Sequence, residues 1–434
     1  MIRLIYNLLW PIGLLFFLPG YFAKMVRRGG YREKFQQRLG IYDGELRARL
    51  RDKRSTWFHA VSVGEVNIAL RLASALRVLE PDLHCALTTT TTTGFALAKQ
   101  NAPPWIEVMY TPVDYWPIMR SAFSAIQPVR IVLVEAEVWP NLAAQAHTRR
   151  VPLVLVNARL SRRSERRYRQ FRFFVAPTFR LLDLVCVPER EDTDRWAALG
   201  VLRDRIRMTG SIKFDPDVRT KSHTAAAFVS DALSLATPES LVLFGGSTHP
   251  GEEEILAKVC VCLRQRFPSL RLFIAPRHVE RLREIRAQLT ALGMRIALAS
   301  DTRTRTGWRD DVDCVLLDTT GELQSWYNVA TVVFVGKSLT SHGGQNPVEP
   351  ILAGMPVVFG PHMENFAKLA KALVAKTGAL EVRDIDSLER AIEELLSDSA
   401  ARERLVQNAR AVVSTHEGAT ARAAALVHEL KSKQ

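Results

Sequence analysis

Cysteine is scarce in this sequence, and the cysteines that are present follow no pairing pattern. The 434 residues include five cysteines, an odd number, and no two of them form a CxxC pair. This argues against a disulfide framework and a cysteine zinc site and favours a reducing compartment. We expect the thiols to act as small buried apolar groups. They are Cys85, Cys186, Cys260, Cys262 and Cys314.

Biased tracts and several catalytic signatures are absent as well. Glycine and proline are spread along the chain, and no HExxH zinc motif occurs. Gly336-Lys337-Ser338 suggests a Walker A loop, but Thr331 stands where that motif requires its first glycine. With 47% hydrophobic and 24% charged residues, the composition is that of a globular protein. The length predicts two domains of roughly 200 residues each.

The net charge of +14 calls for a negatively charged partner. Neither basic stretch carries interleaved aromatic residues or a nucleic-acid motif, so we expect no nucleic-acid partner. An anionic membrane surface or a phosphorylated substrate remains. The first stretch comprises Lys24, Arg27, Arg28, Arg32, Lys34 and Arg38, and the second comprises Arg159, Arg162, Arg163, Arg166, Arg167, Arg169 and Arg172.

A nearly uncharged run from Leu4 to Ala23 is long enough to span a bilayer. The basic residues after it predict a cytoplasmic flank, and no small-x-small site follows that would indicate a cleaved signal peptide. Prolines and glycines interrupt the run, so a kinked helix in the membrane interface competes with a full span, and a buried core helix is a third interpretation. We predict a membrane anchor over residues 1–25.

After this segment, apolar runs alternate with amphipathic stretches such as Val66–Leu79, which is typical of parallel sheets built from βαβ units. Turn residues near Gly210–Pro216 separate two such series and suggest a hinge. We predict an α/β protein with two facing, doubly wound domains over residues 26–210 and 211–434, the last helix packing back on the first domain. The predicted strands are Thr56–Val61, His84–Thr89, Ile131–Val134, Leu153–Asn157 and Leu184–Val187, then Leu241–Phe244, Leu270–Ala275, Cys314–Leu317, Thr331–Val335 and Pro356–Phe359.

Ligands of such sheets bind beyond the carboxyl ends of the strands, so the residues that follow each strand are candidates for chemistry. Glu65 follows the first strand in the turn Ser62-Val63-Gly64-Glu65. It is either a helix first-turn acid favoured by the dipole or a general base, which Gly64 would allow a substrate to approach. Glu135 and Glu137 follow the third predicted strand. No DxD-type cluster or HExxH pattern accompanies this pair, so acceptor binding or local structure is favoured over a metal site.

In the second series, the segment from Phe244 to Glu252 resembles an anion cradle, in which Ser247, Thr248 and backbone N–H groups reach a phosphate at a helix N-terminus. Many α/β turns are rich in glycine for steric reasons alone. Two later strands end in further candidates. These are Arg277 and His278 as cationic contacts, Gly343 and Gly344 as backbone donors, and Glu349 either as a ligand of ribose hydroxyls or as a first-turn helix acid.

Taken in order, six motifs resemble the 3-deoxy-D-manno-octulosonic acid (Kdo) transferase family of lipopolysaccharide core and lipid A synthesis. The resemblance covers essentially the whole chain, including the N-terminal anchor. Single motifs would be weak, but their order and spacing are jointly specific. The motifs are HAVSVGE (His59–Glu65), VEAEVWPN (Val134–Asn141), GSIKFD (Gly210–Asp215), GSTHPGEE (Gly246–Glu253), APRH (Ala275–His278) and GGQNPVEP (Gly343–Pro350).

This resemblance implies a GT-B fold whose first domain binds the acceptor and whose second domain binds CMP-Kdo, without a metal or other cofactor. It implies an inverting transfer of Kdo to the lipid A precursor, lipid IVA, at the cytoplasmic face of the inner membrane, and the anionic membrane surface is a further partner. The family's base carries over to Glu65, and Ser62, Gly64, Glu135 and Glu137 fall to the acceptor cleft. Donor-binding positions carry over to Lys213, Ser247, Arg277, Asn346 and Glu349, with Thr248, His278, Gly343 and Gly344 beside them.

Two other functions remain open at this point. A GT-B transferase that uses a UDP-sugar and a membrane lipid acceptor would share the architecture and a ribose-binding glutamate. A membrane-tethered binding protein without catalysis would explain the anchor and the charge, but not the acids and the glycine-rich loops at the strand ends.

Overall fold

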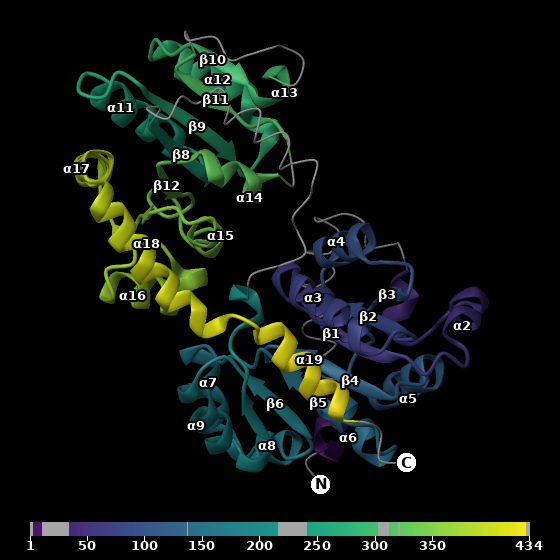
Figure 1. The fold of residues 1–434 in the computed structure, drawn as a ribbon. Coiled ribbons are helices and arrows are strands. Elements are labelled where there is room, and N and C mark those ends of the chain that lie inside the picture. The colour runs from purple at the N-terminus through teal and green to yellow at the C-terminus, as the bar shows by residue number, and fades with distance from the viewer. Residues whose placement is uncertain are drawn as a thin grey trace. The chain divides into compact units, whose positions relative to one another are not determined.

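The computed structural model describes residues 3–10, 34–136, 138–215, 241–302, 312–319 and 322–430. The chain forms two compact units, which we call the first domain (Met1–Asp215 with His416–Gln434) and the second domain (Pro216–Thr415). Each contains a seven-stranded sheet with helices on both faces (Figure 1). The alternation of strands and helices predicted from the apolar runs is confirmed in both domains.

The sheet of the first domain is parallel throughout, in the order β3-β2-β1-β4-β5-β6-β7. The order runs outward in both directions from β1, so the chain reverses its winding between β1 and β4. Because all the strands are parallel, the loops that follow them lie together at the carboxyl end of the sheet. The strands are β1 (Thr56–Ala60), β2 (Cys85–Thr89), β3 (Ile106–Tyr110), β4 (Arg130–Val134), β5 (Leu153–Val156), β6 (Leu184–Val187) and β7 (Ile206–Met208).

Both faces of this sheet are buried. Because successive side chains of a strand point to opposite faces, Trp57 enters one apolar layer while Phe58 and Ala60 enter the other. Residues 3–10 are also helical. The other helices and 3₁₀ turns are η1 (Phe35–Leu39), α2 (Gly44–Leu50), α3 (Val63–Leu79), α4 (Thr92–Asn101), α5 (Trp116–Ile126), α6 (Pro140–Thr148), α7 (Arg162–Gln170), α8 (Arg172–Phe179), α9 (Arg190–Ala198), η2 (Arg203–Arg205), η3 (Ile212–Phe214), η7 (Ser414–His416) and α19 (Ala419–Glu429).

The sheet of the second domain is also parallel, in the order β10-β11-β9-β8-β12-β13-β14. Its central strand β8 is longer than predicted, since pairing with β9 and β12 continues through Gly245 and Gly246. Glycine makes this possible because it has no side chain: a Cβ at Gly246 would collide with the Tyr327 hydroxyl. The strands are β8 (Leu241–Thr248), β9 (Leu270–Pro276), β10 (Ile296–Leu298), β11 (Cys314–Leu316), β12 (Val332–Val335), β13 (Val357–Phe359) and β14 (Leu380–Glu381).

Apolar layers cover both faces of this second sheet as well, with Leu243 on one side and Phe244 on the other. The cysteines at 85, 186, 260 and 314 are buried as expected, whereas Cys262 is exposed, which corrects the expectation for that residue. The helices and 3₁₀ turns are α11 (Glu252–Leu263), η4 (Val279–Arg281), α12 (Leu282–Ala291), α13 (Ala299–Thr302), α14 (Leu323–Trp326), η5 (Tyr327–Val329), α15 (Val348–Leu352), η6 (Glu364–Phe366), α16 (Ala367–Ala375), α17 (Ile385–Ser397) and α18 (Ser399–Val413).

The C-terminal helix α19 belongs to the first domain and packs on α3 (Figure 1). Its apolar face joins the layer that contains Leu72. Its N-terminus is capped from far away in sequence: the Asp215 carboxylate accepts hydrogen bonds from the backbone N–H groups of Gly418 (2.7 Å) and Thr420 (2.6 Å). The last residue of the GSIKFD motif therefore fixes the returning helix to the first domain.

Replacing Asp215 with alanine is expected to loosen α19. Loss of a helix N-cap costs about 0.5–2 kcal/mol, and this carboxylate satisfies two N–H groups. Hydrogen exchange of the α19 amides should become faster in Asp215→Ala. The matched control is Asp398→Ala, which removes the cap of α18. Unchanged α19 exchange in Asp215→Ala, or equal acceleration in the control, would contradict the capping role.

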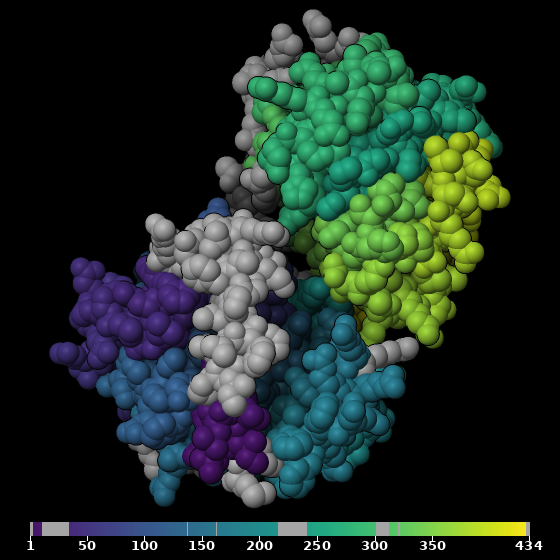
Figure 2. All heavy atoms as spheres, turned by 180° about the vertical axis from the view of Figure 1, so that it is seen from behind, coloured from purple at the N-terminus to yellow at the C-terminus, as the bar shows by residue number. Residues whose placement is uncertain are grey.

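The predicted anchor is only partly described. Residues 3–10 form a helix beside α5 and α6, where Asn7 hydrogen bonds to the Asn141 side chain and accepts from the Trp116 N–H. Figure 2 shows this segment in deep purple on the surface of the first domain. Residues 11–25 lie outside the described part of the chain. Among the described helices, none combines the length and the apolar character that crossing a membrane requires.

Candidate active site

The turn after β1 holds Glu65 in a fixed position. Helix α3 begins at Val63, three residues earlier than predicted, because Ser62 caps it and accepts from the Glu65 N–H. The Glu65 carboxylate in turn accepts from the Val61 N–H (2.8 Å) and from the Ser62 hydroxyl (2.9 Å). Ser62 and Glu65 thus hold each other through two hydrogen bonds at the start of α3. The residue is nearly buried, so its side chain is held in one orientation.

Gly64 leaves room next to this carboxylate. A Cβ built at Gly64 would meet only the Ser62 hydroxyl oxygen, at 3.9 Å. The turn therefore combines an acid oriented by hydrogen bonds with open space at the preceding residue. Such a carboxylate can take a proton from an attacking hydroxyl, and it also serves as a first-turn helix acid.

Residues with positive φ mark the carboxyl ends of several strands. They are Glu135 after β4, Asn157 after β5, Ser247 near the end of β8 and Lys337 after β12, with φ between 50° and 62°. Left-handed backbone is uncommon for residues other than glycine, and such strained positions cluster at binding and catalytic sites. Two of the four, Glu135 and Ser247, were predicted as site residues from the sequence. Glu137 falls outside the described residues.

Three charged residues, Lys213, Arg159 and Glu135, interact at the carboxyl end of the first sheet. Burial lowers the pKa of Lys213, the neighbouring positive charge of Arg159 lowers it further, and the negative charge of Glu135 raises it. Lys213 lies in the first domain, as does Glu135, a predicted acceptor residue. Arg159 was noticed only as part of a basic stretch. Its place just after β5 was the signal that could have identified it.

Asn157, just after β5, holds the GSIKFD motif in place. Its side-chain oxygen accepts from the Ser211 hydroxyl (3.3 Å) and the Ile212 N–H (3.2 Å), and the residue is fully buried. Sequence reasoning placed Asn157 at the end of a strand without assigning it a role. The contact positions η3, which carries Lys213.

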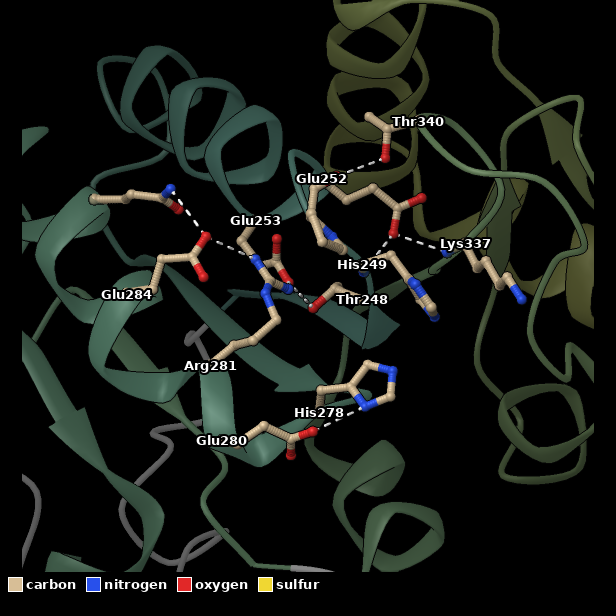
Figure 3. Close-up of polar contacts among 12 residues, drawn as sticks. Thr248, His249, Glu252, Glu253, His278, Glu280, Arg281, Glu284, Lys337 and Thr340 are labelled. Carbon is tan, nitrogen blue, oxygen red and sulfur yellow. Dashed lines mark hydrogen bonds and ion pairs between the residues drawn. The ribbon is translucent and has the colours of Figure 1, made fainter. Parts of the chain in front are cut away.

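In the second domain, a buried glutamate organises the loops at the ends of β8 and β12. The Glu252 carboxylate accepts from the backbone N–H groups of His249, Lys337, Ser338 and Leu339 at 2.8–3.1 Å. Figure 3 shows the bonds from His249 and Lys337. The side chain is fully buried. Four N–H donors compensate a buried carboxylate well, so Glu252 acts as an internal anchor that joins the two loops.

The neighbouring acid, Glu253, is equally buried and fixes the end of β8. It accepts from the Thr248 hydroxyl (3.1 Å) and from the Arg281 guanidinium (2.9 Å), as Figure 3 shows. The Thr248 hydroxyl therefore has a structural role, since it donates its hydrogen bond to Glu253. Neither acid was singled out from the sequence. The run of three glutamates directly after Gly251, at the start of a helix that leaves the central strand, was the available signal.

Positive charge gathers around the same strand ends. Burial lowers the pKa of His249, and the charges of Lys337, His278 and Arg277 lower it further, while Glu253 raises it. Arg277 is exposed, and its N–H donates to the Thr248 carbonyl at 3.0 Å. His278 pairs with Glu280 at 3.3 Å. Lys337 and exposed Arg277 follow β12 and β9, the two strands beside β8, and form a positively charged surface that suits an anionic ligand.

The loop after β12 supplies the remaining predicted residues. Asn346 donates to Glu349 (2.9 Å) and accepts from the Val348 N–H (3.0 Å), so it satisfies the first N–H group of α15 and orients its first-turn acid. Gly343 and Gly344 have φ values of 124° and 67°, which other residues rarely adopt. The predicted donor residues of the second domain thus come together at the carboxyl ends of β8, β9 and β12.

Two Rossmann-like parallel sheets in one chain, each with polar residues at its strand ends, define a GT-B protein. Anabaena HepE, solved in complex with UDP and glucose, has a similar fold, with 15% identity, a TM-score of 0.52, and coverage of 87% of this chain and 100% of that one. A family model described as 3-deoxy-D-manno-octulosonic-acid transferase (kdotransferase) matches residues 33–216, and one described as glycosyl transferases group 1 matches residues 304–412.

Two relatives bear the same name as the first of these models. The 3-deoxy-D-manno-octulosonic acid transferase of Haemophilus influenzae is 32% identical over 92% of this chain and 91% of its own length. That of Bordetella pertussis is 34% identical over 84% of this chain and 85% of its own length. The chain belongs to the 3-deoxy-D-manno-octulosonic acid transferase family of glycosyltransferases.

Proposed function

We propose that this protein transfers Kdo from CMP-Kdo to the lipid A precursor, lipid IVA, in lipopolysaccharide biosynthesis. The observation that carries the proposal is the similarity along nearly the whole chain to relatives named for Kdo transfer. The acid at the end of β1 and the cationic strand ends of the second domain are the groups that such a transfer needs.

The proposed reaction is a single displacement with inversion. A Glu65 carboxylate oxygen takes the proton from a glucosamine hydroxyl of the acceptor, and the hydroxyl oxygen attacks the anomeric carbon of Kdo. The bond from that carbon to the CMP phosphate oxygen breaks, and CMP leaves with the bonding electron pair. The hydrogen bonds from Val61 and Ser62 support this role because they hold the carboxylate in place.

In this proposal, protein groups without a metal stabilise the negative charge that develops on the departing phosphate. Arg277, Lys213 and backbone N–H groups of the glycine-rich loops are assigned to this task. The N–H groups of Gly343 and Gly344 themselves donate to Glu364 and to the Lys337 carbonyl. Glu349, oriented by Asn346, is assigned to the ribose hydroxyls. The first domain is assigned to bind the acceptor. Of the predicted acid pair there, Glu135 and Glu137, the structure describes Glu135.

A lipid acceptor requires the enzyme to work at a membrane surface, and we propose the cytoplasmic face of the inner membrane. Four apolar side chains of the helix at residues 3–10 are exposed, as are one phenylalanine between α7 and α8 and two in the first turn of α8. Arginines of α7 lie next to those phenylalanines in sequence, and such pairs of charge and apolar surface suit an anionic leaflet. The exposed residues are Leu4, Ile5, Leu8 and Leu9, and Phe171, Phe173 and Phe174.

The product mass tests the proposal directly. Purified protein is incubated with tetraacylated lipid A precursor and CMP-Kdo, and the lipid fraction is analysed by mass spectrometry. A mass increase by one or more Kdo units is the expected result, and its size counts the sugars transferred. Absence of product from folded protein would overturn the Kdo assignment.

The nucleotide preference is expected to separate the proposal from its nearest alternative. CMP should compete with the donor at least about tenfold better than UDP, a difference of about 1.4 kcal/mol. Titration calorimetry of the full chain with each nucleotide measures both affinities. Equal binding, or tighter binding of UDP, would favour a UDP-sugar transferase instead.

A further inference from the structure

The loops after β12 and β13 bring two histidines and a glutamate together on the surface of the second domain. β12 and β13 are parallel neighbours, with Val335 opposite Phe359, so the chain leaves both at the same sheet edge. His342 follows the first strand, and His362 and Glu364 follow the second. Within the described ranges, these three form a group whose possible ligand atoms all lie within 4.8 Å of one another.

The distances within this group suit a shared ion. Nδ1 of His342 lies 3.0 Å from a Glu364 carboxylate oxygen, and Nδ1 of His362 lies 3.7 Å from the same oxygen. The centroids of the two imidazole rings are 4.0 Å apart. Ligand atoms at about 2.0–2.2 Å from a tetrahedral zinc ion are separated by about 3.3–3.6 Å, so small side-chain rotations would bring all three into coordination.

The backbone around the group is well supported. The His362 N–H donates to the Ser338 carbonyl (3.0 Å), and the Asn365 N–H donates to the Gly343 carbonyl (2.8 Å). The Gly343 N–H donates to the second oxygen of Glu364 at 2.6 Å. Glu364 is thus oriented by a hydrogen bond from outside the group, as metal-binding carboxylates commonly are.

We propose that His342, His362 and Glu364 bind a zinc ion. Two imidazoles and one carboxylate match the ligand preference of zinc, whereas magnesium prefers oxygen ligands alone. The three protein ligands leave the fourth tetrahedral position to water. None of the three side chains has a role in the proposed transfer chemistry, and the ion would tie the loop that carries Gly343 and Gly344 to the loop after β13.

The test uses the full chain, freed of metals by a chelator and titrated with zinc chloride in a calorimeter. One equivalent of zinc is expected to bind, with much weaker binding of magnesium. At a zinc concentration about 100-fold above Kd, the Tm of the second domain should rise by about 5–10 °C. No binding and no change in Tm would overturn the proposal and leave the group as a hydrogen-bonded link between two loops.

Substitutions locate the ion. Losing a hydrogen-bond partner of a ligand already costs about 10–100-fold in metal affinity, so His342→Ala, His362→Ala and Glu364→Gln should each weaken zinc binding at least tenfold. His278→Ala is the matched control, because His278 pairs with a single glutamate in the same domain. Loss of binding in His278→Ala or in Cys262→Ser, with retention in the three ligand variants, would place the ion elsewhere and refute the site.

Discussion

Glu65→Gln is expected to abolish nearly all Kdo transfer while leaving the protein folded. General-base catalysis contributes typically about 10²–10⁴-fold, and an amide cannot accept the proton. The substitution should preserve the local structure, because the amide oxygen can still accept from the Val61 N–H and the amide nitrogen can donate to the Ser62 hydroxyl. The rate of product formation, followed by mass spectrometry, measures the loss.

A second variant, Ser62→Ala, helps to separate the two roles considered for Glu65, the general base and the first-turn helix acid. Ser62→Ala removes the helix cap and one hydrogen bond to the carboxylate but keeps the carboxylate itself, so we expect a stability loss of about 1 kcal/mol and a modest loss of rate. Full activity in Glu65→Gln would make Glu65 a structural first-turn acid. The search for the base would then move to Glu135 and Glu137, and the family assignment would stand.

Glu252→Gln is expected to damage donor binding and the stability of the second domain together. The carboxylate accepts four backbone N–H groups in a fully buried position. An amide would turn an NH₂ group toward some of these donors, and hydrogen bonds to charged groups are worth about 1.5–3 kcal/mol each. We expect a loss of about 3 kcal/mol in unfolding free energy and weaker CMP binding, measured by denaturant unfolding and calorimetry.

Glu254→Gln provides the matched control two residues away on the same helix. Glu254 forms a half-exposed pair with Lys258 at 2.7 Å, and such surface pairs contribute about 0–1 kcal/mol. The control should bind CMP normally and unfold almost as the wild type does. If Glu252→Gln behaved in the same way, its carboxylate would not be the anchor of the two loops.

Strands buried on both faces were predictable, and edge strands were not. The predicted runs Ile131–Val134, Leu241–Phe244 and Leu270–Ala275, which became parts of β4, β8 and β9, are almost wholly apolar because helices cover both sides of them. β3 escaped notice because it is an edge strand, where Glu107 is partly exposed and interrupts the apolar run. The short edge elements β7, β10 and β14 have only three, three and two residues, too few to form a pattern.

The site was predictable to the extent that it follows strand ends. The rule that ligands of parallel sheets bind beyond the carboxyl ends of strands led to Glu65, Glu135, Ser247 and Arg277 without any tertiary information. It could not identify Glu252 as a buried anchor. A glutamate in the first turn of a helix has the same local sequence whether it faces water or accepts hydrogen bonds from a loop 85 residues later.

The sequence by itself determined the two βαβ series, the strand ends where polar residues gather and the family, because these depend on local periodicity and on short motifs. The return of the last helix to the first domain was also predicted, and only the tertiary structure decided that the Asp215 carboxylate caps it and that His342 meets Glu364. Both contacts join segments that are distant in the chain. Their formation depends on packing and on the satisfaction of buried polar groups, which no local pattern encodes.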